Sequence, residues 1–188
     1  MGKALSDMTL EELWERFPII LTEHEEKWAK WYAEEQERLA GILPREDIRI
    51  SHIGSTAIGN IWAKPIIDIL LELPVHLPMD GVKELLIQNG YLCMAEQQNR
   101  ISFNRGYTTE GYAEKVFHLH LRYAGDNDEL YFRDYLKDNP LLAKQYEELK
   151  RSLWKEFEHD RDGYTRAKTG FITEQTEKAK KYYADRYG

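Results

Sequence analysis

The chain has 188 residues, enough for one domain with a real apolar core, and its twelve Tyr, six Phe and five Trp exclude a disordered acidic chain. A formal net charge of −7 disfavours capture of a nucleic-acid backbone, so nucleic acid is not an expected partner. Cys93 is the only cysteine and no apolar run reaches membrane-spanning length, which favours a cytoplasmic protein without a disulfide or a membrane partner.

The N-terminal part, residues 9–41 approximately, predicts helices. Thr9 precedes the run LEELWERF with Glu12 three residues on, the pattern of a capping box, and Pro18 ends this first helix. A second helix is expected from Thr22 to Ala40, closed by Gly41. Its aromatic and apolar residues form one stripe, which favours core anchors over a ligand cage: Trp28, Trp31, Tyr32 and Leu39.

The pattern changes to strands between about residues 48 and 122. A capped helix is expected from Asp80 to Gly90, and a Gly- and Thr-containing loop from Gly106 to Glu114. Short apolar or alternating runs predict five strands, at Arg49–Ile53, Ile66–Leu73, Tyr91–Ala95, Ile101–Arg105 and Lys115–Arg122.

Residues 128–184 predict helices again, with Pro140 at a helix start and a last helix from Phe171 to Tyr183. No repeat, low-complexity stretch or interdomain linker interrupts the chain. We therefore expect a single domain over residues 1–188, of the α/β (α+β) class, with a mixed sheet flanked by N- and C-terminal helices.

The stretch HIGSTAIGNIWAKPIIDILL is the most informative part of the chain. A Gly54-Ser55-Thr56 turn follows one predicted strand, and Asp68 lies inside the next apolar run. Backbone N–H groups and a hydroxyl in such a turn hold phosphate, and a carboxylate in a strand is a candidate metal ligand. The alternative is an ordinary turn, with Asp68 paired to a nearby Arg or Lys.

Histidines provide a second cluster of candidates. In the run KVFHLHLR, His118 and His120 share one face of a strand, because alternate residues point the same way. They would bind one metal or one phosphate together with His52 if their strands neighbour each other. The alternative is that the histidines hydrogen-bond one another and Asp68, which would fix the sheet around a buried carboxylate.

Three cationic side chains are candidates for offsetting phosphate charge. Lys64 precedes Pro65 and Arg105 ends the run SFNR. Lys168 lies on one helical face with Tyr164 and Phe171, a face that would equally serve to dock the helix.

Four segments together carry a family resemblance: HIGSTAIGNIWAKPIID, FHLHLRYAG, FRDYLKDNPLLAKQYEELK and YTRAKTGFI. They resemble the GrpB family, a branch of the nucleotidyltransferase-like superfamily, over about residues 23–172. The resemblance implies a nucleotidyltransferase-like fold, in which Gly54 and Ser55 hold a nucleotide phosphate and Asp68 is the first metal-binding and catalytic carboxylate.

The sequence departs from the active superfamily pattern at the second carboxylate, where Leu70 stands. Glu72 shares the face of Asp68 but lies about 13 Å along the strand. A divalent cation (Mg²⁺, Mn²⁺ or Zn²⁺) is a candidate cofactor, although imidazole ligands disfavour Mg²⁺. The leading hypothesis is binding of a nucleotide or another phosphorylated small molecule, with nucleotidyl transfer left open. The alternative is an inactive ligand-sensing or protein-interaction module.

Overall fold

The computed structural model describes residues 4–184, 186 and 187. In this part of the chain one five-stranded sheet has the order β1-β2-β5-β4-β3. β2 and β5 pair in parallel at its centre, and the other neighbouring pairs are antiparallel, so the sheet is mixed. The strands are β1 (Arg49–Ile53), β2 (Ile67–Leu73), β3 (Leu92–Gln97), β4 (Arg100–Thr108) and β5 (Gly111–Tyr123).

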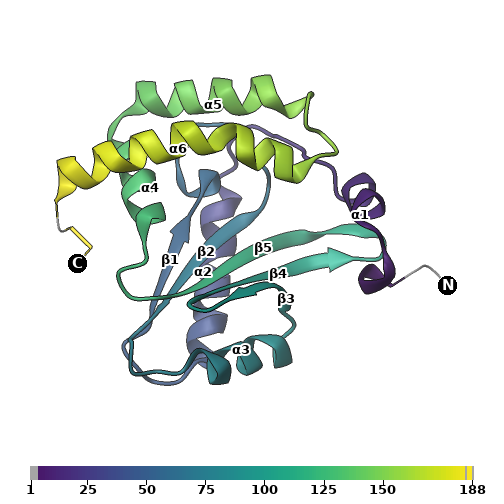
Figure 1. Ribbon diagram of the computed structural model, residues 1–188, viewed down its shortest axis with the longest axis vertical. Helices are drawn as coiled ribbons and strands as arrows, with labels where there is room; N and C mark the ends of the chain where they lie inside the picture. Colours follow the sequence, from purple (N-terminus) through teal and green to yellow (C-terminus); the bar gives the residue numbers. More distant parts are fainter. Residues whose placement is uncertain (1–3, 185, 188) are drawn as a thin grey trace.

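Helices lie on both sides of this sheet (Figure 1). The α-helices are α1 (Leu10–Arg16), α2 (Lys27–Ile42), α3 (Met79–Gln88), α4 (Asp128–Asp138), α5 (Pro140–Trp154) and α6 (Arg161–Tyr183). Two short 3₁₀ turns, η1 (Leu5–Asp7) and η2 (Ser55–Ala57), complete the described elements. None of the described helices is long and apolar enough to span a membrane.

The main core lies between α2, α3 and one face of the sheet. Trp28 and Leu39 of α2 pack with Ile69 of β2 and Leu119 of β5, and all four side chains are buried. The expected apolar stripe of the second helix is therefore confirmed as core. Because successive strand residues alternate between faces, the intervening residues of β2 and β5 point to the other face, which α4, α5 and α6 border.

The predicted first helix is confirmed with its capping box, since Thr9 and Glu12 exchange both hydrogen bonds. The start of the second helix is wrong by five residues. Thr22 forms an antiparallel bridge with Ala63 through hydrogen bonds of 2.9 and 3.0 Å, so the chain is extended there, and α2 begins at Lys27.

The predicted loop over residues 106–114 is also wrong. β4 continues to Thr108 and β5 begins at Gly111, which makes a long hairpin. Gly106 adopts φ +90° at a register shift in β4 and lies against the backbone of Lys115, so it forms a bulge inside the strand. A glycine at this position resembles a strand end in the sequence, but the strand continues through it.

The C-terminal helices are confirmed, with Pro140 in the first turn of α5. The last helix starts ten residues earlier than expected. Asp160 accepts a hydrogen bond of 2.8 Å from the backbone N–H of Gly163, and this cap starts α6 at Arg161. The early start places Tyr164 and Lys168 on the same helix as Phe171.

Candidate functional site

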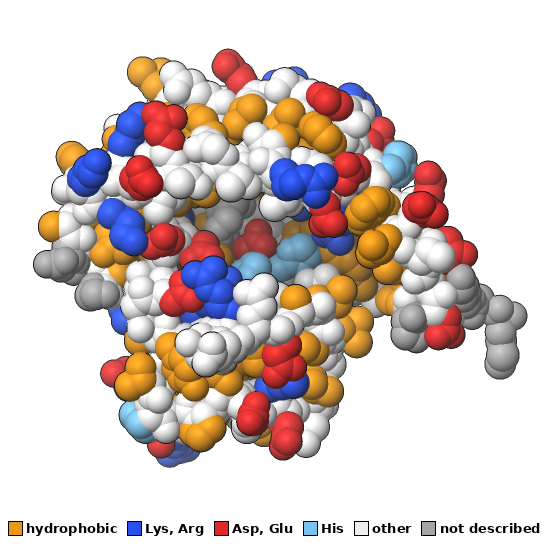
Figure 2. Space-filling view, viewed as in Figure 1, with side chains coloured by type: hydrophobic (Ala, Val, Ile, Leu, Met, Phe, Trp, Pro, Cys, Tyr) orange, Lys and Arg blue, Asp and Glu red, His pale blue; other side chains and the backbone are white. Residues whose placement is uncertain are grey.

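A carboxylate and two imidazoles meet on the sheet face opposite α2. In the parallel pair β2–β5, Asp68 lies in register with His118, and His120 follows on the same face. The three side chains are partly exposed. Figure 2 shows acidic and histidine side chains at the floor of a hollow on this side of the molecule. We call this region the Asp68 hollow.

Both histidines contact the same oxygen of Asp68. His118 Nδ1 lies 3.4 Å and His120 Nε2 lies 3.7 Å from Asp68 Oδ1. Burial opposes ionisation of the carboxyl, but hydrogen bonds from the two imidazoles outweigh it and hold the pKa of Asp68 well below its usual range. Burial lowers the pKa of His118 to about 4, so this imidazole is neutral near pH 7.

A hydrogen-bonded chain fixes the ring of His118. Arg161 Nη2 donates to Tyr107 Oη over 2.7 Å, and Tyr107 Oη lies 2.8 Å from His118 Nε2. Arg161 can only donate, so the phenol hydrogen is free to be donated to Nε2. The ring proton of neutral His118 is then on Nδ1 and points at Asp68, which can only accept.

Gly54 makes room for the carboxylate. Its φ of +71° is in the left-handed region, and a Cβ built on it would lie 3.0 Å from Asp68 Cβ and closer still to Oδ2. A side chain at this position would therefore clash with Asp68 and strain the backbone. The next residue, Ser55, opens the turn η2 and lies near the phenol of Tyr146 of α5. The Gly-Ser turn and Asp68 thus form one unit.

Lys64 and Lys168 lie beside this unit. Lys64 Nζ is 5.8 Å and Lys168 Nζ is 4.1 Å from the centre of the Tyr164 ring. Burial lowers the pKa of Lys64 to about 7 and of Lys168 to about 8, while the charge of Asp68 raises both. Within the described residues, neither ammonium has an ion pair or hydrogen bond, and Arg161 adds a third positive charge that bonds only the Tyr107 phenol.

Thr56 and His52 do not join the Asp68 hollow. His52 pairs with Ile69, so its side chain points to the α2 face, where its ring stacks on Tyr32 at 4.6 Å. Its Nε2 lies 2.9 Å from the hydroxyl of Thr56, which is buried and bonds the carbonyl of Ile66. These two residues hold β1 to the turn, and burial lowers the pKa of His52 to about 4.

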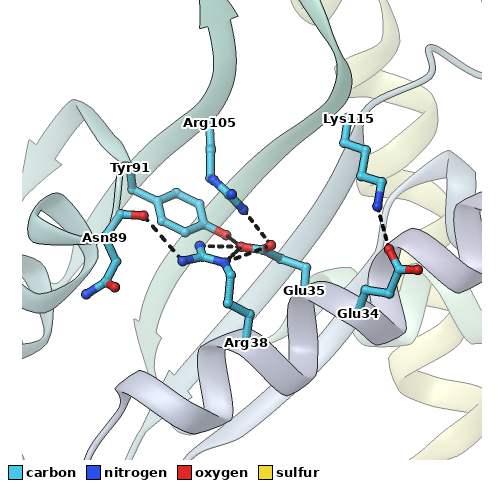
Figure 3. Close-up of polar contacts among 7 residues, drawn as sticks. All are labelled: Glu34, Glu35, Arg38, Asn89, Tyr91, Arg105 and Lys115. Carbon is cyan, nitrogen blue, oxygen red and sulfur yellow. Dashed lines mark hydrogen bonds and ion pairs between the residues drawn. The ribbon is translucent and has the colours of Figure 1, made fainter.

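Arg105 also lies away from the Asp68 hollow. It pairs with Phe117 in the sheet and therefore points to the α2 face. There its Nη1 donates to Glu35 over 2.6 Å, in a network with Arg38 and Tyr91 (Figure 3). Glu35 is buried, which gives Arg105 a structural partner instead of a phosphate.

A two-metal site does not fit these residues. Leu70, at the position of the second carboxylate, is fully buried against Ile53 and Leu130. Glu72 is held by Asn127 at 3.0 Å. No three His, Cys, Asp or Glu side chains in the described chain gather so as to hold a metal ion. His118 Nδ1 and His120 Nε2 face Asp68 Oδ1 at 3.4 and 3.7 Å. Because an ionised carboxylate can only accept, the ring nitrogen of His118 that faces it is the one expected to carry the proton.

Four residues near Asp68 or its turn carry little signal in the sequence: Tyr107, Arg161, Tyr146 and Lys150. Lys150 is buried, donates to the carbonyl of Trp62 and lies 4.9 Å from the centre of the Tyr146 ring. Its only sequence signal was a charge on an otherwise apolar face of α5. Tyr107 lay in a segment predicted as loop, where no face could be assigned.

The fold and site together define an α/β protein whose mixed sheet carries a carboxylate–histidine cluster beside unpaired cations. The GrpB protein family matches residues 18–178, so the chain belongs to the GrpB family, as the resemblance implied. The glutamate-rich protein GrpB of Alkalihalophilus pseudofirmus is 35% identical to this chain, and the match covers 83% of this chain and 92% of that protein.

Two further matches support the same family. UPF0157 protein YqkA of Bacillus subtilis is 37% identical over 87% of this chain, which spans about half (47%) of that protein. The crystal structure of conserved protein GrpB from Enterococcus faecalis has a TM-score of 0.74 and 30% identity, covering 87% of this chain and 99% of that chain. The predicted mixed sheet flanked by N- and C-terminal helices is confirmed. More distant neighbours include Cid1 poly(U) polymerase with MgGTP, at a TM-score of 0.48, 12% identity and coverage of 75% and 44%.

Proposed function

We propose that this protein binds a nucleotide or another phosphorylated small molecule in the Asp68 hollow. The observation that carries the proposal is the pair of lysines, Lys64 and Lys168, that lie partly buried and form no ion pair with an acidic side chain of the described residues. Holding a charged amine away from water costs free energy unless a counter-charge is present. A phosphate group would supply that counter-charge.

Each part of the site has a role in this proposal. The turn at Gly54 and Ser55 offers backbone N–H groups and a hydroxyl to phosphate oxygens. Lys64, Lys168 and Arg161 offset the phosphate charge. The proposal is for binding, and the packed Leu70 gives no support for nucleotidyl transfer by two metal ions.

Titration calorimetry with nucleoside mono-, di- and triphosphates and with inorganic pyrophosphate tests the proposal. We expect saturable binding that weakens about tenfold, equivalent to 1.4 kcal/mol, in Lys168→Gln. Lys178→Gln is the matched control, because Lys178 lies on the same helix but pairs with Glu174 at the surface. No binding of any of these phosphates would contradict the proposal.

A second candidate function is a ligand-sensing or protein-interaction module without catalysis. Leu70 favours this function. It stands where an active enzyme of this fold would have its second metal-binding carboxylate, and it is packed in an apolar cluster. Phosphate binding without turnover, beside a stable protein partner recovered in pull-downs, would support this function. Steady nucleotide turnover that Asp68→Ala abolishes would exclude it.

A further inference from the structure

The Asp68 hollow combines several cations with one carboxylate that is flanked by two imidazoles. His118 Nδ1 and His120 Nε2 lie 3.4 and 3.7 Å from Asp68 Oδ1, and the other oxygen of Asp68 lies against Gly54. A metal ion at Asp68 would have to displace these imidazoles or take their lone pairs. For His118 the lone pair is on Nε2, where Tyr107 lies 2.8 Å away.

The support behind His118 makes that exchange costly. For Nδ1 to become a free ligand, the ring proton would have to move to Nε2, and Tyr107 Oη, which already accepts from Arg161 of α6 over 2.7 Å, would have to accept from Nε2 instead of donating to it. Three elements, β4, β5 and α6, therefore contribute to keeping a donor aimed at Asp68. The second carboxylate that a metal pair needs is replaced by a packed leucine, Leu70.

Cationic side chains of the hollow can neutralise a phosphate, the role that metal ions have in a metal-dependent site. Lys64, Lys168 and Arg161 carry three positive charges when both lysines are protonated, a state that a bound anion would favour, and Asp68 is an acidic side chain whose charge acts on all three. Side-chain ammonium and guanidinium groups bind phosphate directly with charge-assisted hydrogen bonds. The hollow thus already contains the charge that a divalent cation would bring.

We infer that the Asp68 hollow binds its phosphorylated ligand without a divalent metal, with Lys64, Lys168 and Arg161 in place of the ion. The inference rests on the proposed function and deepens it. In such a site no metal ion links Asp68 to the phosphate. It anchors the two imidazoles and lies as a negative charge beside the bound anion.

Calorimetry with pyrophosphate and ATP, in EDTA and then with excess Mg²⁺ or Mn²⁺, tests the inference. We expect affinity in EDTA within about threefold of that with metal, or tighter, because free phosphate carries more negative charge than its metal complex. Binding that requires a metal would overturn the inference and leave the proposed function standing. Absence of binding in both conditions would overturn both.

The variant Asp68→Asn separates the two mechanisms by the sign of its effect. In a metal-free site the substitution removes a negative charge beside the anion, so pyrophosphate should bind about threefold tighter or more. In a metal-dependent site it removes a ligand, and binding should be lost. Circular dichroism and thermal unfolding establish that the variant is folded, and Lys168→Gln, expected to weaken binding, shows that the titration reports on the hollow.

Titration with Mn²⁺ or Zn²⁺ alone gives a readout that does not depend on the phosphate ligand. We expect no stoichiometric binding of either ion to the wild-type protein. One ion per chain, bound by the wild type and lost in Asp68→Asn, would overturn the inference.

Discussion

Lys64 shows how a residue can serve a ligand at a cost to the fold. Its ammonium lies beside Lys168 and Arg161, and burial lowers its pKa from 10.5 to about 7. A charge held in this way destabilises the folded protein when no anion is bound. The buried charge of Lys64 should therefore affect two measurable quantities, the affinity for a phosphate ligand and the pH dependence of the free energy of unfolding.

We predict that the free energy of unfolding rises between pH 7 and pH 10.5, the folded and unfolded pKa values of Lys64. In this range the unfolded chain keeps a proton on Lys64 that the folded protein has released, so raising the pH favours folding. Below pH 7 both states are protonated and Lys64 contributes no slope. Lys64→Met should be more stable than the wild type near neutral pH, and the difference should shrink towards pH 10.5. Urea unfolding across this range measures it, and equal slopes for both proteins would refute the prediction.

Gly54 carries the second prediction at this scale. Its φ of +71° and the approach of Asp68 leave no room for a Cβ, so Gly54→Ala should lower the free energy of unfolding by about 2 kcal/mol and weaken pyrophosphate binding. Gly41→Ala is the control, since Gly41 lies in α2 with open space around it. This substitution should raise the free energy of unfolding by roughly 0.5–1 kcal/mol. Urea unfolding distinguishes them. Equal effects would show that the turn is not constrained.

Among the elements, β2 decides what the site contains. Its alternate residues, Ile67, Ile69 and Leu71, enter the main core, while Asp68 and Leu70 point to the other face. Only Asp68 reaches the hollow, because Leu70 is covered by Leu130 of α4 and Ile53 of β1. On this face of β2, a partly exposed carboxylate at Asp68 is thus followed two residues later by a buried apolar side chain at Leu70.

We predict that Leu70→Asp destabilises the protein by about 3 kcal/mol or more, because it buries a charge without a partner. It should not create a metal site. Leu141→Asp is the control, since Leu141 is 84% exposed on α5 and should change stability little. Urea unfolding followed by Mg²⁺ and Mn²⁺ titration checks both points. A stable Leu70→Asp protein that binds two metal ions would show that the position remains a carboxylate site.

Across the whole molecule, the two faces of the sheet hold separate polar networks. On the α2 face, Glu35 accepts hydrogen bonds from Arg38, Tyr91 and Arg105, which ties α2 to β4 and to the segment before β3 (Figure 3). On the opposite face lies the Asp68 hollow. The sheet and its apolar core separate the two, so one is expected to support the fold and the other the ligand.

We predict that Glu35→Ala lowers the free energy of unfolding by about 3 kcal/mol, because it leaves two guanidinium groups without their carboxylate. Pyrophosphate affinity of the folded variant should stay unchanged. Glu37→Ala on the exposed side of α2 is the control and should be nearly neutral. Urea unfolding and calorimetry measure the two effects. A loss of affinity in Glu35→Ala would show that the faces are coupled.

The sequence by itself determined the family and the order of most helices and strands, and it named the candidate residues that the structure brings together around Asp68. Gly54, Ser55, Asp68 and the His118–His120 pair could be found because their signals are local: a turn, a charge in an apolar run and a period of two. The parallel pairing of β2 and β5 then placed Asp68 beside His118, as the strand adjacency assumed from the resemblance required.

Only the tertiary structure decided which of the other candidates face that unit. His52 and Arg105 lie on strands of the same sheet, but strand register turns both towards α2. Arg161 and Tyr107 join the site from elements distant in the sequence. A side chain's face depends on register and on which buried partner it can reach, and both are set by packing between segments far apart in the chain.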